Sequence, residues 1–164
     1  MEADHELAVF ARLVARRAQD EPDRLAVVFE SGEQGAELVR NRDLERHGNQ
    51  VAWELRRAGL RSGDKVAVML RNHPEFVYAM VAASKLGLVT VPIDPRARGD
   101  RLRYLLTFAG CQALVVQSQA AAHELHPGVP ARRRRIAQPL ALAQVGRMQL
   151  YVLMYGQRIV SAIP

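Results

Sequence analysis

Residues 63–94 read GDKVAVMLRNHPEFVYAMVAASKLGLVTVPID, and this stretch determines the fold predicted for the chain. The valine-rich run Lys65–Leu70 is bounded by turn residues and is typical of a buried strand. Pro74 suits the first position of a helix, where its missing N–H is not needed, and Gly87 suits the end of that helix. The apolar run Val89–Ile93 predicts a second strand. Together they form a βαβ unit, which predicts two parallel strands joined by a right-handed crossover.

The helix of this unit has a favourable first turn and one apolar face. Glu75 lies in the first turn, where a carboxylate complements the positive end of the helix dipole. Residues at helical spacing predict the buried face: Phe76, Met80, Val81, Ser84 and Leu88.

Further strands and helices are predicted on both sides of this unit. We expect helices over Glu6–Ala18, Asn41–Ala58 and Gly99–Ala109, a hairpin of strands Leu25–Phe29 and Glu37–Arg40, and a strand over Ala113–Gln117. The first helix should turn Leu7, Phe10, Leu13 and Val14 inward, and Asn41 should cap the second. The fold class is therefore α/β, a partial parallel sheet of βαβ units with covering helices.

The same periodicity predicts one shared core. We expect the following residues to be buried together: Val66, Val68, Leu70, Phe76, Met80, Val89, Val91, Leu102, Leu105, Leu106, Leu114 and Val116.

Composition indicates an ordinary globular protein of the cytoplasm. The 164 residues are 49% apolar and 24% charged, enough for one domain with a real core. A single cysteine, Cys111, excludes an internal disulfide framework. The acidic N-terminus lacks the features of a signal peptide, and Phe76–Ile93 reads as a helix followed by a strand and not as a membrane span.

The last part of the chain differs from the rest in charge. Residues 120–164 contain six arginines, no lysine and one acid, Glu124, whereas residues 1–119 are nearly balanced. We therefore place a boundary near Gln119, between residues 1–119 and a basic tail of residues 120–164. In that tail we expect a helix over Leu140–Leu150 and a strand over Leu150–Met154.

Residues 20–119 resemble the N-terminal part of adenylate-forming enzymes, the AMP-dependent acyl-CoA synthetases and ligases. The family patterns PDR-ALVFE, GDRVAVMLPNSPEFV, LKAGAVYVPIDPR and RG-EL-YIL are matched in order by Pro22–Glu30, Gly63–Val77, Ser84–Arg96 and Arg98–Leu106. The family's usual aromatic residue is missing from Val39–Leu44. The resemblance implies the fold of the N-terminal subdomain of those enzymes.

The resemblance also implies a chemistry whose residues are missing from this sequence. The full-length family uses ATP, Mg and CoA to convert a carboxylate into an acyl-adenylate and then a thioester. Its phosphate loop needs clustered backbone N–H groups and a lysine. The run Ser62–Lys65 precedes a strand and carries an acid, and the two lysines, Lys65 and Lys85, belong to the scaffold. We therefore assign no catalytic, cofactor-binding or metal residue, and we expect the chain alone to be inactive.

Other candidate sites have ordinary explanations. The five histidines, His5, His47, His73, His123 and His126, form no complete metal pattern, and only the last two are close in sequence. Cys111 has no identifiable base and reads as a small core residue. The run Arg132–Arg135 lacks interleaved aromatic residues, so we do not expect nucleic-acid binding.

Three functions remain open at this stage. The first is a truncated homologue of an acyl-CoA synthetase, the second is a stand-alone α/β interaction module, and the third is a basic-tailed nucleic-acid binder. With the rest of the enzyme missing, we expect an open sheet edge. Such an edge favours self-association, or pairing with a full-length ligase, over coverage by the tail. On that expectation, deleting residues 120–164 should leave the unfolding midpoint nearly unchanged.

Overall fold

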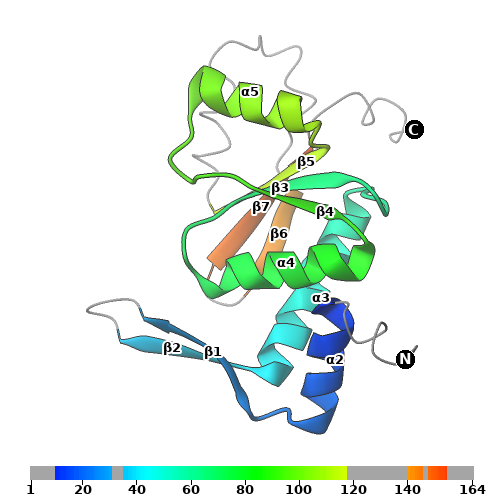
Figure 1. The fold of residues 1–164 in the computed structure, drawn as a ribbon, viewed down its shortest axis with the longest axis vertical. Helices are drawn as coiled ribbons and strands as arrows, with labels where there is room; N and C mark the ends of the chain where they lie inside the picture. The colour runs from blue at the N-terminus through cyan, green and yellow to red at the C-terminus, as the bar shows by residue number, and fades with distance from the viewer. Residues whose placement is uncertain (1–9, 31–34, 118–139, 146–147, 155–164) are drawn as a thin grey trace, which may run out of the picture.

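The computed structural model describes residues 10–30, 35–117, 140–145 and 148–154 (Figure 1). The elements in chain order are α2 (Phe10–Asp20), β1 (Leu25–Glu30), β2 (Ala36–Arg40), α3 (Asn41–Arg57), β3 (Lys65–Met69), α4 (Pro74–Leu86), β4 (Val89–Pro92), α5 (Gly99–Ala109), β5 (Ala113–Val116), β6 (Leu140–Val145) and β7 (Met148–Met154). The mixed α/β architecture with parallel βαβ units confirms the predicted fold class.

The βαβ unit at the centre of the sequence forms as predicted. Strand β3 pairs with β4 in parallel, and α4 connects them. Pro74 begins α4, and Gly87 ends it in the left-handed conformation at φ 66°. A side chain at Gly87 would also collide with the next loop, because an added Cβ would lie 2.6 Å from Ser62 Oγ. The start of α4 at Pro74 and its end at Gly87 therefore each have a local physical cause.

The main sheet has the strand order β4-β3-β5-β7-β6. Strand β3 also pairs with β5 in parallel, whereas β5–β7 and β7–β6 are antiparallel. Helix α4 covers one face of the sheet together with α3, and α5 covers the other (Figure 1). Strands β3 and β5 are thus central, and β4 and β6 form the two edges.

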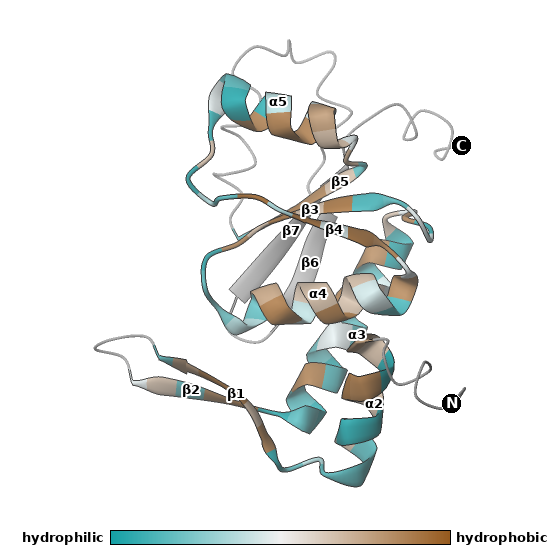
Figure 2. Ribbon diagram, viewed as in Figure 1, coloured by the Kyte–Doolittle hydropathy of each residue, from teal (hydrophilic) through white to brown (hydrophobic). Residues whose placement is uncertain are grey.

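The buried residues form two cores, one on each face of the sheet, and not the single core that was predicted. Val66 and Val68 belong to the core beneath α3 and α4, whereas Leu102, Leu114 and Val116 belong to the core beneath α5. Strand residues alternate between the two faces, which is why neighbours along β3 enter different cores. Figure 2 shows the hydrophobic residues concentrated on these central strands and on α4.

Two residues of the predicted core are exposed. Met80 is 37% exposed and Val89 is 48% exposed. Val89 begins β4, which has a neighbour on one side only, and an edge strand leaves part of its side chains in solvent. Helix α4 buries Val81, as predicted, but it also buries Tyr78 and Ala79, so its inward face is rotated away from Met80.

The N-terminal elements confirm the predicted hairpin and correct two details of the helices. Strands β1 and β2 pair antiparallel. The described part of helix α2 starts at Phe10. It buries Ala11 and, as predicted, Val14, whereas Phe10 and Leu13 are 39% and 41% exposed. Leu7 lies outside the described residues.

Asn41 is the first residue of α3 and not its N-cap. Arg40 occupies the cap position, and the Asn41 side chain donates a hydrogen bond of 2.8 Å to the Glu21 carbonyl oxygen. Asn41 therefore ties the start of α3 to the loop after α2.

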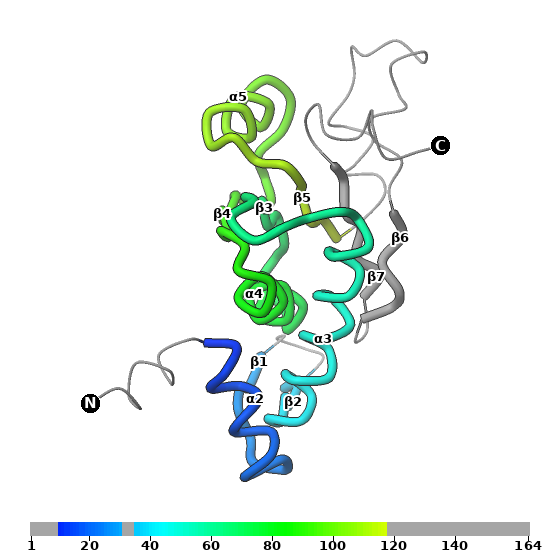
Figure 3. The backbone as a smooth tube through the Cα atoms, turned by 90° about the vertical axis from the view of Figure 1, so that its right-hand side faces the viewer, coloured from blue at the N-terminus to red at the C-terminus, as the bar shows by residue number. Residues whose placement is uncertain are grey.

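The prediction for the end of the chain is wrong in its main feature. Residues 140–145 form a strand and not the first part of a helix, and β7 extends the predicted strand back to Met148. The two strands pair antiparallel up to Val145 and Met148, so they form a hairpin whose two connecting residues lie outside the described ranges. Strand β7 pairs along all of β5, and β6 contacts α3. The edge of β5 is therefore covered by the tail, contrary to expectation, while the boundary near Gln119 stays a prediction. Figure 3 shows the rest of the arrangement, with α4 and α5 on opposite sides of β3, β4 and β5.

Within the described ranges, no helix has the length and hydropathy needed to cross a membrane. Phe76–Ile93 divides into the end of α4 and strand β4, as the sequence indicates.

Candidate functional site

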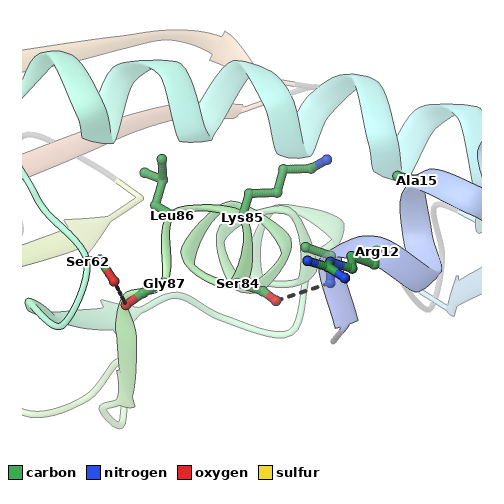
Figure 4. Close-up of a pocket in the computed structure, with 8 residues that line it drawn as sticks. Arg12, Ala15, Ser62, Ser84, Lys85, Leu86 and Gly87 are labelled. Carbon is green, nitrogen blue, oxygen red and sulfur yellow. Dashed lines mark hydrogen bonds between the residues drawn. The ribbon is translucent and has the colours of Figure 1, made fainter. Parts of the chain in front are cut away.

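A hollow of about 540 Å³ lies where the start of α2 meets the end of α4 (Figure 4). The backbone N–H of Ala11 donates a hydrogen bond of 3.1 Å to Ser84 Oγ, which joins the two helices. On the opposite side, Ser62 Oγ lies 3.5 Å from the Gly87 carbonyl oxygen. The lining residues are Ala11, Arg12, Ala15, Ser62, Ser84, Lys85, Leu86 and Gly87.

The groups in this hollow do not form a catalytic arrangement. Among the described residues that line it there is neither a histidine nor a carboxylate, so none of them places a general base beside either serine hydroxyl. Lys85 points towards α3, where its Nζ lies 2.9 Å from each carboxylate oxygen of Glu45. The Lys85 side chain is only 17% exposed. The hollow is therefore a polar junction between helices, and Lys85, one of the two cations in its lining, is already paired.

Lys65, the second lysine of the sequence, also has a structural role. Its Nζ donates a hydrogen bond of 2.9 Å to the carbonyl oxygen of Ala109 at the end of α5. A cation at this position complements the negative end of the helix dipole. Its backbone N–H donates to Gln112 Oε1 at 2.5 Å. Lys65 thus fastens the end of α5 to the start of β3.

The run Ser62–Lys65 forms a closed turn and not a phosphate cradle. The Asp64 side chain accepts a hydrogen bond of 2.9 Å from the Arg61 backbone N–H, and the Asp64 N–H donates to the Arg61 carbonyl oxygen at 3.0 Å. A carboxylate occupies the turn, and it would repel a phosphate. These residues do not fit the phosphates of ATP.

The carboxyl ends of the parallel strands are the second place where an α/β fold offers a site. After β3 the chain forms β4 on one side of it and then β5 on the other side. Strands β3 and β5 therefore flank a topological switch point, which is where ligands bind in open α/β sheets. Arg71, Asn72 and His73 follow β3 at this edge. They include no nucleophile, and His73 serves as the N-cap of α4 without a side-chain hydrogen bond.

At the same edge, Asp94 and Arg96 follow β4 and form a tight ion pair. Arg96 Nη2 lies 2.9 Å from Asp94 Oδ2, and the Arg96 backbone N–H donates to Asp94 Oδ1 at 2.8 Å. These hydrogen bonds lower the pKa of Asp94 to about 2. Asp94 is therefore held as an anion and cannot act as a proton donor near neutral pH.

Sequence reasoning missed a buried polar cluster between α3 and α4. The His47 ring lies against the Tyr78 ring, with their centroids 4.8 Å apart. Burial raises the pKa of the Tyr78 phenol well above its usual range, and the carboxylate of Glu75 acts in the same direction. Glu75 is 2% exposed, and its Oε2 has no hydrogen-bond partner within the described residues. The spacing of Glu75 and Tyr78, three residues apart on one helix, was the signal that could have indicated their proximity.

The remaining sequence candidates fall into two groups. Cys111 is 4% exposed in the core beneath α5, as expected, and burial raises the pKa of its thiol. The described part of the chain contains no group of three or more histidine, cysteine or acidic side chains placed to hold a metal ion. His5, His123, His126 and Arg132–Arg135 lie outside the described residues.

Comparison with known proteins gives one consistent result. A family model described as "AMP-binding enzyme" matches residues 14–149. Bacitracin synthase 2 of Bacillus licheniformis is 34% identical over 107 residues, which cover 65% of this chain and 4% of that protein. Crotonobetaine/carnitine–CoA ligase of Salmonella paratyphi A is 32% identical over 97 residues, which cover 59% of this chain and 19% of that one.

Solved structures lead to the same group of proteins. The N-terminal subdomain of Klebsiella oxytoca NpsA, in complex with anthranilyl-AMSN, superposes with a TM-score of 0.57 at 26% identity. The match covers 65% of this chain and 27% of that subdomain. Fatty acid AMP ligase from Legionella pneumophila has the same fold, with a TM-score of 0.57 at 22% identity. The matched segment is thus a small part of each relative.

Proposed function

Because the chain belongs to the AMP-binding enzyme family, whose model matches residues 14–149, we propose that it forms the N-terminal scaffold layer of an adenylate-forming fold. In this proposal the scaffold positions other parts of a carboxylate-activating enzyme, and the chain alone does not adenylate an acid. The known relatives supply the reaction class, since both peptide synthetases and acid–CoA ligases are among them.

The observation that carries the proposal is the engagement of both lysines. ATP-dependent activation needs a mobile cation against the phosphates. Lys65 Nζ is bonded to the Ala109 carbonyl oxygen, and Lys85 Nζ is paired with Glu45 across two helices. Releasing either lysine for catalysis would leave the end of α5 or the α3–α4 contact without its polar partner.

In its finer form, the proposal is that the carboxylate-activating enzyme to which this scaffold corresponds is an acyl-CoA synthetase that acts in the cytoplasm. The RGDRLRYLL run beginning at Arg98, which resembles carnitine-type ligases, and the identity with crotonobetaine/carnitine–CoA ligase support it. A second candidate is activation of an amino acid, and the 34% identity with bacitracin synthase 2 favours it. Self-association, or docking on a full-length ligase through a sheet edge, belongs to the same proposal.

The proposal predicts that MgATP does not stabilise the chain. A ligand present at 100 times its Kd raises the free energy of unfolding by about 2.7 kcal/mol. For a chain of this size, such a gain corresponds to a rise of roughly 5–10 °C in Tm. We expect a change close to zero when thermal unfolding is followed with and without millimolar MgATP.

Sulfate at matched ionic strength is the control, because a chain of net charge +6 responds to any polyanion. The Lys65→Met and Lys85→Met variants should lower Tm equally with and without ATP. The proposal would be contradicted if ATP raised Tm, sulfate did not, and either lysine variant abolished the rise.

A further inference from the structure

The outer face of α5 carries two aromatic rings that project into solvent. Tyr104 is 63% exposed and Phe108 is 79% exposed. Their rings stack on each other, with centroids 5.6 Å apart and planes inclined by 20°. The opposite side of the helix buries Leu102 and Leu106, so the core fixes the direction in which the aromatic rings point. Helix α5 is therefore apolar on both sides, although it covers the sheet with only one.

Arginines are concentrated before and at the start of the helix that carries this aromatic ridge, defined here as Tyr104 and Phe108. The segment that contains α5, Asp94–Gln117, has four arginines and two acids. Both acids are paired, because Asp94 binds Arg96 and Asp100 lies 3.2 Å from Arg103. The segment is left with a net positive charge. Figure 2 shows the corresponding change along α5, which is hydrophilic at its start and hydrophobic towards its end.

We propose that the aromatic ridge and its arginines form a docking surface for an amphipathic helix of a partner protein, with carboxylates beside the apolar face of that helix. Tyr104 and Phe108 are four residues apart, and such ridges pack into the grooves of a second helix. Aromatic residues and arginine are the types enriched at the centres of protein interfaces. The net positive charge before and at the start of α5 favours an acidic partner and speeds its encounter.

Two other occupants fit the surface less well. A second copy of this chain would bring the arginines of two identical faces together, and each copy carries a net charge of +6. A single-stranded nucleic acid needs open ring faces on which successive bases stack. In α5 the facing sides of the two rings are occupied by each other.

The test measures binding of designed peptides to the full-length chain by fluorescence anisotropy. The probe is an 18-residue helical peptide with a leucine stripe flanked by glutamates, and its matched partner has lysine at each glutamate position. We expect saturable binding of the acidic peptide, at least roughly tenfold weaker binding of the lysine peptide, and weakening by added salt. The Phe108→Ser and Arg101→Glu variants should each weaken binding of the acidic peptide roughly tenfold.

Trp53→Ser in α3 is the matched control, because Trp53 is a 58% exposed aromatic residue whose ring centroid lies 4.5 Å from Cζ of Arg57 on the same helix, away from α5. Its binding should equal that of the unsubstituted chain, and all variants should keep the same cooperative unfolding. Absent or unsaturable binding overturns the proposal, as does equal binding by Phe108→Ser. The proposal is also overturned if the chain forms a dimer that Phe108→Ser disrupts, because the surface then binds a second copy. It is likewise overturned if a single-stranded oligonucleotide displaces the peptide, because the surface then binds nucleic acid. None of these outcomes depends on whether the chain binds ATP.

Discussion

Replacing Val68 with aspartate is expected to abolish cooperative folding. Val68 is 1% exposed on β3, which has neighbours on both sides in the sheet. It belongs to the hydrophobic cluster beneath α3 and α4. An unpaired charge in such a place costs several kcal/mol, which is a large part of the roughly 5–15 kcal/mol by which a domain is stable. Circular dichroism should show no unfolding transition for Val68→Asp.

Val89→Asp is the matched control for this substitution. It places the same charge on the neighbouring strand β4, at a side chain that is 48% exposed. We expect it to retain a cooperative transition, with a loss on the order of 1 kcal/mol. If Val68→Asp unfolds at the same temperature as the unsubstituted chain, β3 is not the centre of the fold.

Deleting residues 120–164 is expected to destabilise the remaining chain strongly. The deletion removes β7, which pairs with four consecutive residues of the buried strand β5. At about 1 kcal/mol for each net hydrogen bond, loss of this pairing costs on the order of 4 kcal/mol. It also exposes the edge of a buried strand, which promotes aggregation. The shortened chain should show a lower unfolding midpoint and larger species in light scattering.

Leu153→Pro tests the same contact within the full-length chain. Leu153 pairs with Leu114 within the part of β7 that lies against β5, and proline, which has no backbone N–H, is poorly tolerated inside a sheet. Deletion of residues 155–164 leaves the β6–β7 hairpin in place and serves as the control. An unchanged midpoint after deletion of residues 120–164 would show that β7 does not support the sheet.

Local signals explain why the central unit could be predicted from the sequence. Pro74 and Gly87 fix the ends of α4 through backbone chemistry that needs no distant partner. The apolar runs on either side are strands because they are short, β-branched and bounded by turns. The order of β3, α4 and β4 then follows from general rules of chain connection.

The contacts that could not be predicted join residues far apart in the chain. The pairing of β7 with β5 closes a long loop, and nothing local to Leu140–Met154 specifies it. Val89 looked like a core residue because periodicity does not show which strand becomes an edge. Met80 looked like one because α4 is apolar around most of its circumference, so spacing alone does not fix its inward face. The same holds for the candidate site, where Lys85 meets Glu45 from 40 residues away and Lys65 meets Ala109 from 44. Periodicity and motif spacing cannot report such partners.

Pyrophosphate release is the most direct measurement of the central claim that this chain is a scaffold without adenylating activity of its own. The purified chain is incubated with MgATP and, in turn, with amino acids, aromatic acids and fatty acids. The account predicts release no faster than in a protein-free control for every acid. Pyrophosphate release that requires a particular acid would contradict the account if either lysine variant abolished it. The variants are Lys65→Met and Lys85→Arg, the second of which retains the charge opposite Glu45.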